Sequence, residues 1–149
     1  MNLEEIINGD IKAAMLAKER QRLDALRAIK SALLLLKTEK VGAEITEEAE
    51  LKVIQKLVKQ RKDAAELYKA QGRDDLYQEE IFQLEVISNY LPEQLSDEEI
   101  ANVLKSLIAE HNINGVKEMG KLMGLASKAL SGKADNKKVS EIVKQLLNG

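Results

Sequence analysis

Cysteine is absent from the 149-residue sequence, so disulfide bonds, a thiol nucleophile and a cysteine-ligated metal are all excluded. Aromatic residues are also scarce: Phe82 and three tyrosines are present, there is no tryptophan, and the only proline is Pro92. Alanine, leucine, isoleucine, lysine and glutamate dominate what remains. A composition poor in proline and rich in these residues is typical of a nearly all-helical protein.

Long hydrophobic runs are missing as well. No apolar stretch approaches the ~20 residues that a transmembrane helix needs. The first residues, Met-Asn-Leu-Glu-Glu, are acidic and lack the basic and then apolar plan of a signal peptide. We therefore expect a cytoplasmic protein without a membrane partner.

Charge is distributed unevenly along the chain. Residues 115–149 contain seven lysines against Glu118, Asp135 and Glu141, a net charge of +4. Residues 1–114 contain 16 basic and 22 acidic side chains, a net charge of −6. A basic segment on an otherwise acidic protein points to an anionic partner for that segment.

Apolar residues recur at helical spacing along almost the whole chain, which predicts an all-α fold. Residues 1–90 are expected to form a four-helix unit and residues 91–149 a three-helix bundle. The boundary is placed at Tyr90-Leu91-Pro92-Glu93-Gln94-Leu95, because Pro92 disfavours helix at Leu91. Each of the last three helices carries a complete apolar stripe, so we expect the two parts to fold separately.

Residues at the expected helix ends support these boundaries. Asn2 with Glu5, and Ser96 with Glu99, have the spacing of capping boxes. Thr46 and Asp135 are expected to be N-caps, and Gly72 is expected to end a helix at its C′ position.

Two places in the first half depart from a simple helical pattern. The first apolar face consists of Leu3, Ile6, Ile7, Ile11, Ala14 and Met15. This face lapses over residues 18–22, which predicts a tight joint near Lys18–Arg20. Residues 33–36 are four consecutive leucines, so we expect this end of the second helix to be buried on more than one side, in the core or in a dimer seam. Val41-Gly42 is expected to close that helix.

The segment Val116–Leu130 is predicted to be the helix that carries the basic surface. At about 100° per residue, its core face holds Met119, Leu122, Met123, Ala126 and Leu130. Its opposite face holds Lys117, Lys121, Lys128, Gly120 and Gly124.

Two glycines inside a helix cost about 1 kcal/mol each relative to alanine, so something should compensate for them. One interpretation is that Gly120 and Gly124 allow a close backbone approach by an anionic partner. The other is that a neighbouring helix packs tightly against them and the lysines are merely solvated. The sequence pattern leaves both open.

Catalytic chemistry has no convincing signal in the sequence. His111 is the only histidine, no acid stands at metal-ligand spacing from it, and its expected place is a helix C-terminus. No glycine-rich loop follows a strand, and the serines lack a partnered base. A basic patch within residues 56–62 of the third helix is interpreted as solvated or salt-bridged. We therefore predict no catalytic residue, no metal site and no cofactor.

Several motifs, in order along the chain, resemble the YqeY-like family. They are Arg22-Leu23, Leu26-Arg27, Ile29-Lys30-Ser31-Ala32-Leu33, Val58-Lys59-Gln60-Arg61, Gly72-Arg73-Asp74-Asp75-Leu76 and Tyr90-Leu91-Pro92-Glu93-Gln94-Leu95. The resemblance extends over essentially the whole chain. For residues 1–90 it implies a fold but no role.

Residues 115–149 also resemble the tail domain of GatB, the B subunit of the tRNA-dependent amidotransferase that converts Glu-tRNA(Gln) or Asp-tRNA(Asn). The matching pieces are Gly120-Lys121-Leu122-Met123-Gly124, Gly132-Lys133-Ala134-Asp135, Val139 and Leu146. Asn136 departs slightly, because the tail often reads Asn-Pro there. In that family the tail is a helical bundle that contacts tRNA, and the kinase-like and amidase chemistry lies elsewhere.

The resemblance implies the family label of carbon–nitrogen ligase activity with glutamine as amido-N-donor. The catalytic cradle of GatB and its amidase partner have no counterpart in the sequence, so we expect an accessory factor that binds tRNA or another structured RNA. The scarcity of aromatic residues argues for recognition of shape and phosphates rather than bases. The expected binding residues are Lys117, Gly120, Lys121, Gly124, Lys128, Lys133, Lys137 and Lys138.

Two alternatives remain open. One is a protein-interaction module, associated with aminoacylation or translation machinery, in which the glycine face packs on a partner helix. The other is an amide-transfer enzyme or its accessory subunit, which would need a constellation that the sequence does not reveal or a partner that supplies ammonia.

Overall fold

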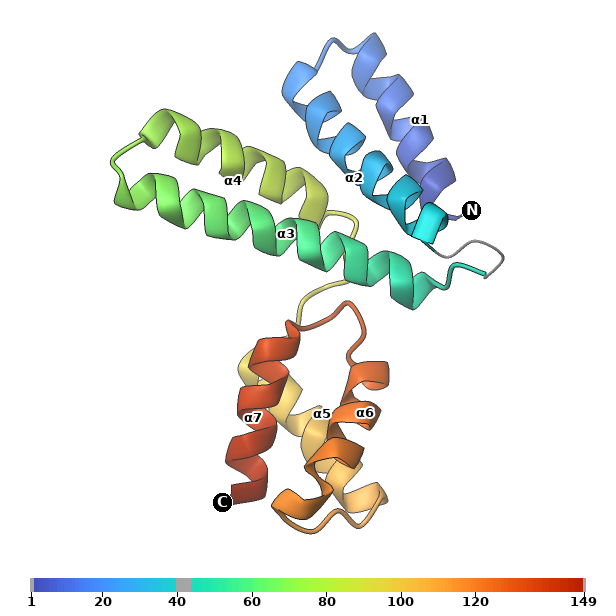
Figure 1. The fold of residues 1–149 in the computed structure, drawn as a ribbon, viewed down its shortest axis with the longest axis vertical. Coiled ribbons are helices and arrows are strands. Elements are labelled where there is room, and N and C mark those ends of the chain that lie inside the picture. The colour runs from blue at the N-terminus through green and yellow to red at the C-terminus, as the bar shows by residue number, and fades with distance from the viewer. Residues whose placement is uncertain (1, 40–43, 149) are drawn as a thin grey trace. The chain divides into compact units, whose positions relative to one another are not determined.

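The computed structural model describes residues 2–39 and 44–148, which form seven α-helices and one 3-10 helix and contain no strand. The predicted all-α fold is therefore confirmed. The internal contacts divide the chain into two compact units, Met1–Leu91 and Pro92–Gly149 (Figure 1). None of the helices in the described part is long and apolar enough to cross a membrane.

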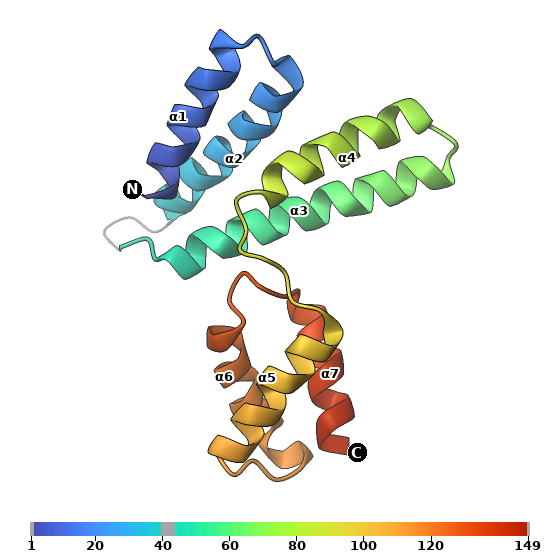
Figure 2. The same ribbon diagram turned by 180° about the vertical axis from the view of Figure 1, so that it is seen from behind.

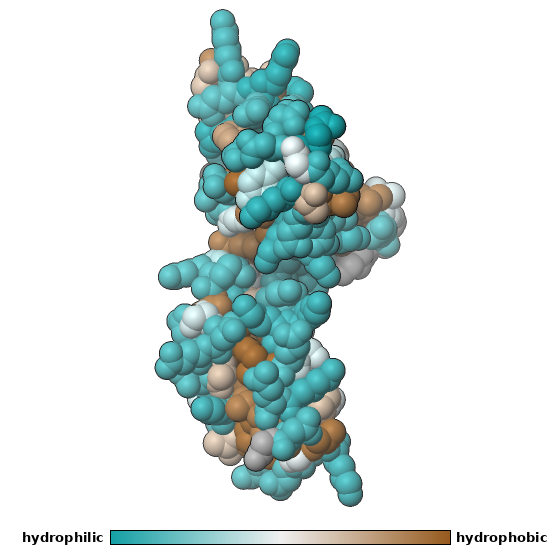
Figure 3. All heavy atoms as spheres, turned by 90° about the vertical axis from the view of Figure 1, so that its left-hand side faces the viewer, coloured by the Kyte–Doolittle hydropathy of each residue, from teal (hydrophilic) through white to brown (hydrophobic). Residues whose placement is uncertain are grey.

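The first unit consists of two helical hairpins, α1–α2 and α3–α4, whose pairings are visible in Figures 1 and 2. The helices are α1 (Leu3–Leu16), α2 (Arg20–Glu39), α3 (Glu47–Ala70) and α4 (Asp74–Ser88). Their shared core consists of Ile7, Ala14, Ala25, Leu26, Ile29, Leu33, Ile54 and Ile87. Hydrophilic residues cover most of the face drawn in Figure 3, with apolar atoms showing between them.

Local capping explains where these helices begin and end. The Asn2 side chain accepts a hydrogen bond from the Glu5 N–H at 2.9 Å, and Thr46 accepts from Ala49 at 3.1 Å. Gly72 has a φ of +71° and ends α3, as predicted, because this left-handed conformation is the usual C′ geometry. The tight joint expected near Lys18–Arg20 is also confirmed, because α1 ends at Leu16 and α2 begins at Arg20.

The four-leucine run does not behave as predicted. Leu33 is buried, but Leu34 and Leu35 are 47% and 60% exposed. Four consecutive residues span most of a helical turn, and the helices that pack on α2 cover only part of that circumference. Ile6 and Met15 are likewise exposed rather than inward-facing. The expected closure of α2 at Val41-Gly42 lies outside the described residues.

Polar contacts fix the surface of the first unit. Arg61 on α3 forms an ion pair with Glu80 on α4 at 3.1 Å, as the salt-bridged interpretation of this basic patch anticipated. The hydroxyl of Tyr90 donates to the carboxylate of Asp10, which ties the end of this unit to α1. Burial and this hydrogen bond raise the pKa of Tyr90 above its usual value.

The second unit is a three-helix bundle with one additional 3-10 turn. Its elements are α5 (Asp97–Glu110), η1 (Val116–Glu118), α6 (Met119–Ala129) and α7 (Asn136–Asn148). The fully buried centre consists of Ile100, Leu104, Leu122, Ala126 and Val143. At the start of α5, Ser96 and Glu99 form the predicted capping box: the Glu99 N–H donates to the Ser96 hydroxyl at 3.2 Å, and the Ser96 N–H donates to the Glu99 carboxylate at 3.0 Å.

Candidate nucleic-acid interface

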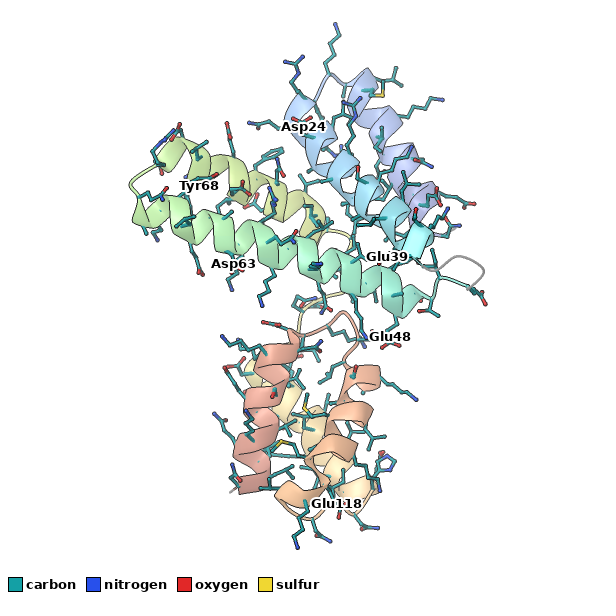
Figure 4. All side chains as sticks on the ribbon, in the orientation of Figure 1. Asp24, Glu39, Glu48, Asp63, Tyr68 and Glu118 are labelled. Atoms are coloured by element: carbon teal, nitrogen blue, oxygen red, sulfur yellow. The ribbon has the colours of Figure 1, made fainter. Side chains whose placement is uncertain are left out.

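The start of the basic helix differs from the prediction. Val116–Glu118 is a 3-10 turn and α6 begins at Met119, so the expected α-helical start at Val116 is wrong and Lys117 lies before the α-helix. Gly115 enters this turn with a φ of +70°, and the Glu118 side chain, labelled in Figure 4, accepts from the Asn114 N–H at 3.4 Å. Such 3-10 turns are frequent at helix N-termini.

The core face of α6 agrees with the prediction. Leu122 and Ala126 are fully buried, and Leu130, just after the helix, is also buried. Met119 and Met123 are partly buried against the same core. The opposite side of α6 is therefore left to face away from the bundle.

The two glycines of α6 lie on an open surface. A Cβ atom added at Gly120 or at Gly124 would meet no heavy atom within 4 Å. The alternative in which a neighbouring helix packs tightly on these glycines is therefore wrong for the part of the chain that the structure describes. Lys121 and Lys128 are exposed and stand seven residues apart, which places them on the same side of α6.

A second group of lysines surrounds the turn from α6 to α7. Lys133 and Lys137 are exposed, and Asp135 caps α7 as predicted by accepting from the Lys137 N–H at 3.3 Å. The first turns of α2, α6 and α7 contain no acidic residue, whereas those of α1, α3, α4 and α5 all do. Glu118 and Asp135 stand directly before α6 and α7, so a carboxylate lies near the positive end of each of these two helix dipoles.

Lys138 differs from the other candidate residues because it is paired. Its ammonium lies 2.8 Å from the Asp97 carboxylate at the start of α5. This hydrogen bond raises the pKa of Lys138 above its usual value. Asp97 thus competes with any anionic ligand for this lysine, a relationship that the sequence pattern did not reveal.

The turn between α6 and α7 is held by residues that the sequence reasoning did not assign to the site. The side-chain amide of Gln94 donates to the Gly132 carbonyl at 2.7 Å, and the Leu95 N–H donates to the Lys133 carbonyl at 3.0 Å. Gly132 has a φ of +73°, which favours glycine at this position. The boundary motif thus supports the turn that carries Lys133.

His111 lies at the C-terminal end of α5, as predicted, and is exposed. Among the residues that the structure describes, no group of three or more histidine, cysteine, aspartate or glutamate residues could hold a metal ion. What the arrangement offers is an exposed set of ammonium groups beside a bare stretch of helix.

A model of the Yqey-like protein family matches residues 4–147. The chain belongs to the YqeY-like family. It is also similar to proteins named "Altered inheritance of mitochondria protein 41, mitochondrial". The relative from Pyrenophora tritici-repentis is 28% identical over 95% of this chain and 78% of its own length.

Two further relatives with that name match smaller parts. The one from Clavispora lusitaniae is 38% identical over 70% of this chain, and one from Saccharomyces cerevisiae is 31% identical over 58%. The matched part spans less than two thirds of each of these relatives, 62% and 46%. Their names describe mitochondrial proteins, so a cytoplasmic location does not hold across the relatives of this chain.

Proposed function

We propose that the C-terminal unit of this YqeY-like chain binds structured RNA, and tRNA in particular. The open glycine face of α6 is the observation that carries the proposal: a Cβ atom at Gly120 or Gly124 would meet no heavy atom within 4 Å, and the exposed Lys121 and Lys128 lie beside these glycines on the helix. Two interior glycines weaken a helix, and no packing against them offsets this cost within the described residues. Binding of an RNA backbone on this face would account for the two glycines.

Recognition would rest on phosphates and shape. Residues 92–149 contain no phenylalanine, tyrosine or tryptophan, so this unit has no aromatic platform on which bases could stack. Lysines are point charges that meet phosphates without reading a sequence. A folded RNA with a fixed phosphate path, such as tRNA, suits this surface better than an unstructured strand.

The role that follows is that of an accessory factor in tRNA-dependent amide transfer, with the catalytic groups supplied by a partner. The likeness of residues 115–149 to the tail domain of GatB supports the tRNA and the amidotransferase connection. Both a bacterial cytoplasm and a mitochondrial matrix contain tRNA, so the proposal does not depend on the compartment. The competing proposal is a protein-interaction module whose partner places a helix on the same glycine face.

A charge-reversal experiment tests the proposal. The variant Lys121→Glu, Lys128→Glu should abolish tRNA binding, measured by fluorescence anisotropy, and keep the helical circular dichroism signal. Exposed substitutions of this kind change stability by less than about 0.5 kcal/mol each. The matched control is Lys105→Glu, Lys144→Glu, which changes the net charge equally at two exposed lysines of α5 and α7.

Salt dependence separates RNA from a protein partner. Each lost phosphate contact should reduce the slope of log K against log salt by roughly 0.7–0.9. A helix packed on the glycine face would show almost no such dependence. If the control variant loses tRNA as fully as Lys121→Glu, Lys128→Glu does, binding is a property of net charge and the proposed site is wrong.

A further inference from the structure

The turn that joins α1 to α2 combines exposed apolar side chains with unpaired cations. Met15 and Leu16, in the last turn of α1, are 55% and 78% exposed, and Ala13 and Ala17 beside them are exposed as well. In Figures 1 and 2 this turn stands away from α3 and α4. Figure 3 shows apolar atoms among long hydrophilic side chains at this end of the unit.

Local geometry fixes the shape of this tip. The Glu19 N–H donates to the Ala14 carbonyl at 3.0 Å, and the Lys18 N–H donates to the Met15 carbonyl at 3.2 Å. This pair of bonds is a Schellman motif, which needs a left-handed residue at C′. Lys18 occupies that position with a φ of +58°, where glycine would be less costly. The turn therefore does not explain why a lysine stands there.

Charge at the tip is opposite to that of the rest of its unit. Residues 12–22 contain four basic residues and one acidic residue, a net charge of +3. The remaining residues of 1–91 contain 11 basic and 16 acidic residues, a net charge of −5. Arg22 is paired with Glu19 at 3.2 Å, whereas no ion pair of the described residues involves Lys12, Lys18 or Arg20.

The cations border the apolar side chains. Lys12 stands three and four residues before Met15 and Leu16, which makes them neighbours on the surface of α1. Lys18 and Arg20 follow directly in the turn and at the start of α2. Figure 4 shows long nitrogen-ended side chains extending from this turn.

We propose that the α1–α2 tip docks on the surface of an anionic lipid bilayer, with Met15 and Leu16 entering the interface and Lys12, Lys18 and Arg20 meeting lipid phosphates. Peripheral binding of this kind combines a small buried apolar area with attraction to anionic lipids. A nucleic acid would use the three cations but would gain nothing from the exposed methionine and leucine. The tip therefore favours a bilayer over RNA.

This proposal departs from the sequence analysis, which expected no membrane partner because no segment is long and apolar enough to span a membrane. Spanning needs about 20 apolar residues, whereas docking needs a few side chains that reach the interface. The proposal is independent of RNA binding by the C-terminal unit, because the two surfaces share no residue. Either proposal can therefore be wrong while the other is right.

Co-sedimentation of the full chain with lipid vesicles tests the docking surface. The protein should bind vesicles of phosphatidylcholine with 30% phosphatidylglycerol at low salt and should not bind vesicles of phosphatidylcholine alone. The variant Met15→Ser, Leu16→Ser should lower the partition coefficient more than tenfold. The matched control is Leu34→Ser, Leu35→Ser, because these leucines are also exposed on α2 but lie outside the basic tip.

A second variant, Lys12→Gln, Lys18→Asn, Arg20→Gln, removes the three cations of the tip. Asparagine is used at position 18 because it tolerates a positive φ. Each cation near an anionic surface contributes about fivefold, so the partition coefficient should fall by on the order of 100-fold. The matched control is Lys56→Gln, Lys59→Gln, Lys62→Gln, which removes three exposed cations from α3.

Three results would overturn the proposal. They are no binding to the anionic vesicles, equal loss in a tip variant and its matched control, and binding that survives loss of Met15 and Leu16. A fourth outcome assigns the tip to another ligand: if the charge variant weakens tRNA binding while vesicles are not bound at all, the cations belong to an RNA surface.

Discussion

The side-chain amide of Gln94 bridges the carbonyl oxygens of Pro92 and Gly132, at 2.9 and 2.7 Å. These residues belong to the boundary motif and to the turn between α6 and α7, two stretches that are distant in sequence. The bridge closes the end of the bundle where the chain enters it. The boundary motif is therefore part of the fold of the second unit and not a free linker.

The first prediction concerns this bridge. Gln94→Ala leaves the Gly132 carbonyl without its donor and should lower the free energy of unfolding by about 1 kcal/mol. The control is Gln145→Ala on the exposed side of α7, which should change stability by less than about 0.5 kcal/mol. Chemical denaturation of the three proteins measures both values. Equal effects at the two positions would show that the Gln94 bridge contributes nothing.

The second prediction is that the two units fold separately. A fragment of residues 92–149 should be helical and unfold cooperatively, because it retains the core around Leu104 and Leu122 and the boundary bonds. A fragment that starts at Asp97 loses Gln94, Leu95 and the Ser96 cap, so it should unfold at a lower temperature. A fragment 92–149 that is unstructured while the full chain is stable would contradict this division. Thermal unfolding of both fragments and of the full chain, followed by circular dichroism, measures these differences.

The third prediction concerns pH. The Ser96 N–H holds the pKa of Glu99 below its usual value. A lowered folded-state pKa stabilises the protein above the unfolded pKa of about 4.3, and this contribution is lost as pH falls through the folded value. Glu99→Gln should therefore flatten the loss of stability in the acid range, with little change in slope near neutral pH. Denaturation at a series of pH values measures this, and an unchanged acid slope would exclude the Glu99 contribution.

Helix ends were predictable from the sequence because their chemistry is local. Thr46, the Ser96–Glu99 pair and Asp135 each satisfy backbone groups two or three residues away, so spacing alone identified them. Gly72 was predictable for the same reason. The 3-10 turn before α6 was missed because the apolar stripe continues at helical spacing through it, and periodicity does not distinguish the two helix types there.

Contacts between distant segments were not predictable. Leu34 and Leu35 look like core residues, but periodicity does not say how many helices pack around α2. Gly124 fitted either a packed or an open surface, and only the space around it decides. The Gln94 bridge and the Asp97–Lys138 pair join residues 38 and 41 positions apart, and no local pattern reveals them.

The fourth prediction separates bulk from charge at the glycine face. Gly124→Leu should keep or raise stability, by up to about 1 kcal/mol, because the site is open and leucine favours helix. It should still weaken tRNA binding, since the side chain holds the phosphate backbone away. Gly9→Leu is the matched control: Gly9 lies in α1 with equally open surroundings, so it should stabilise without affecting tRNA. Undiminished tRNA binding by Gly124→Leu would place the RNA elsewhere.

The last prediction uses the pairing of Lys138 with Asp97. Asp97→Asn removes the carboxylate that holds this ammonium and also removes a negative charge from the neighbourhood of the lysines. Exposed ion pairs are weak, so the gain in tRNA affinity should be modest, up to about fivefold at low salt. If the released Lys138 gains a phosphate contact, the slope of log K against log salt should steepen by roughly 0.7–0.9.

Two further variants isolate this lysine. Glu110→Gln removes one negative charge from the opposite end of α5 and should leave affinity almost unchanged. In a Lys138→Gln background, Asp97→Asn should gain little, because the ammonium that it would release is no longer there. An equal gain with and without Lys138 would mean that Asp97 acts only through its own charge. A loss of affinity in Asp97→Asn would mean that the ion pair positions Lys138 for the RNA instead of withholding it.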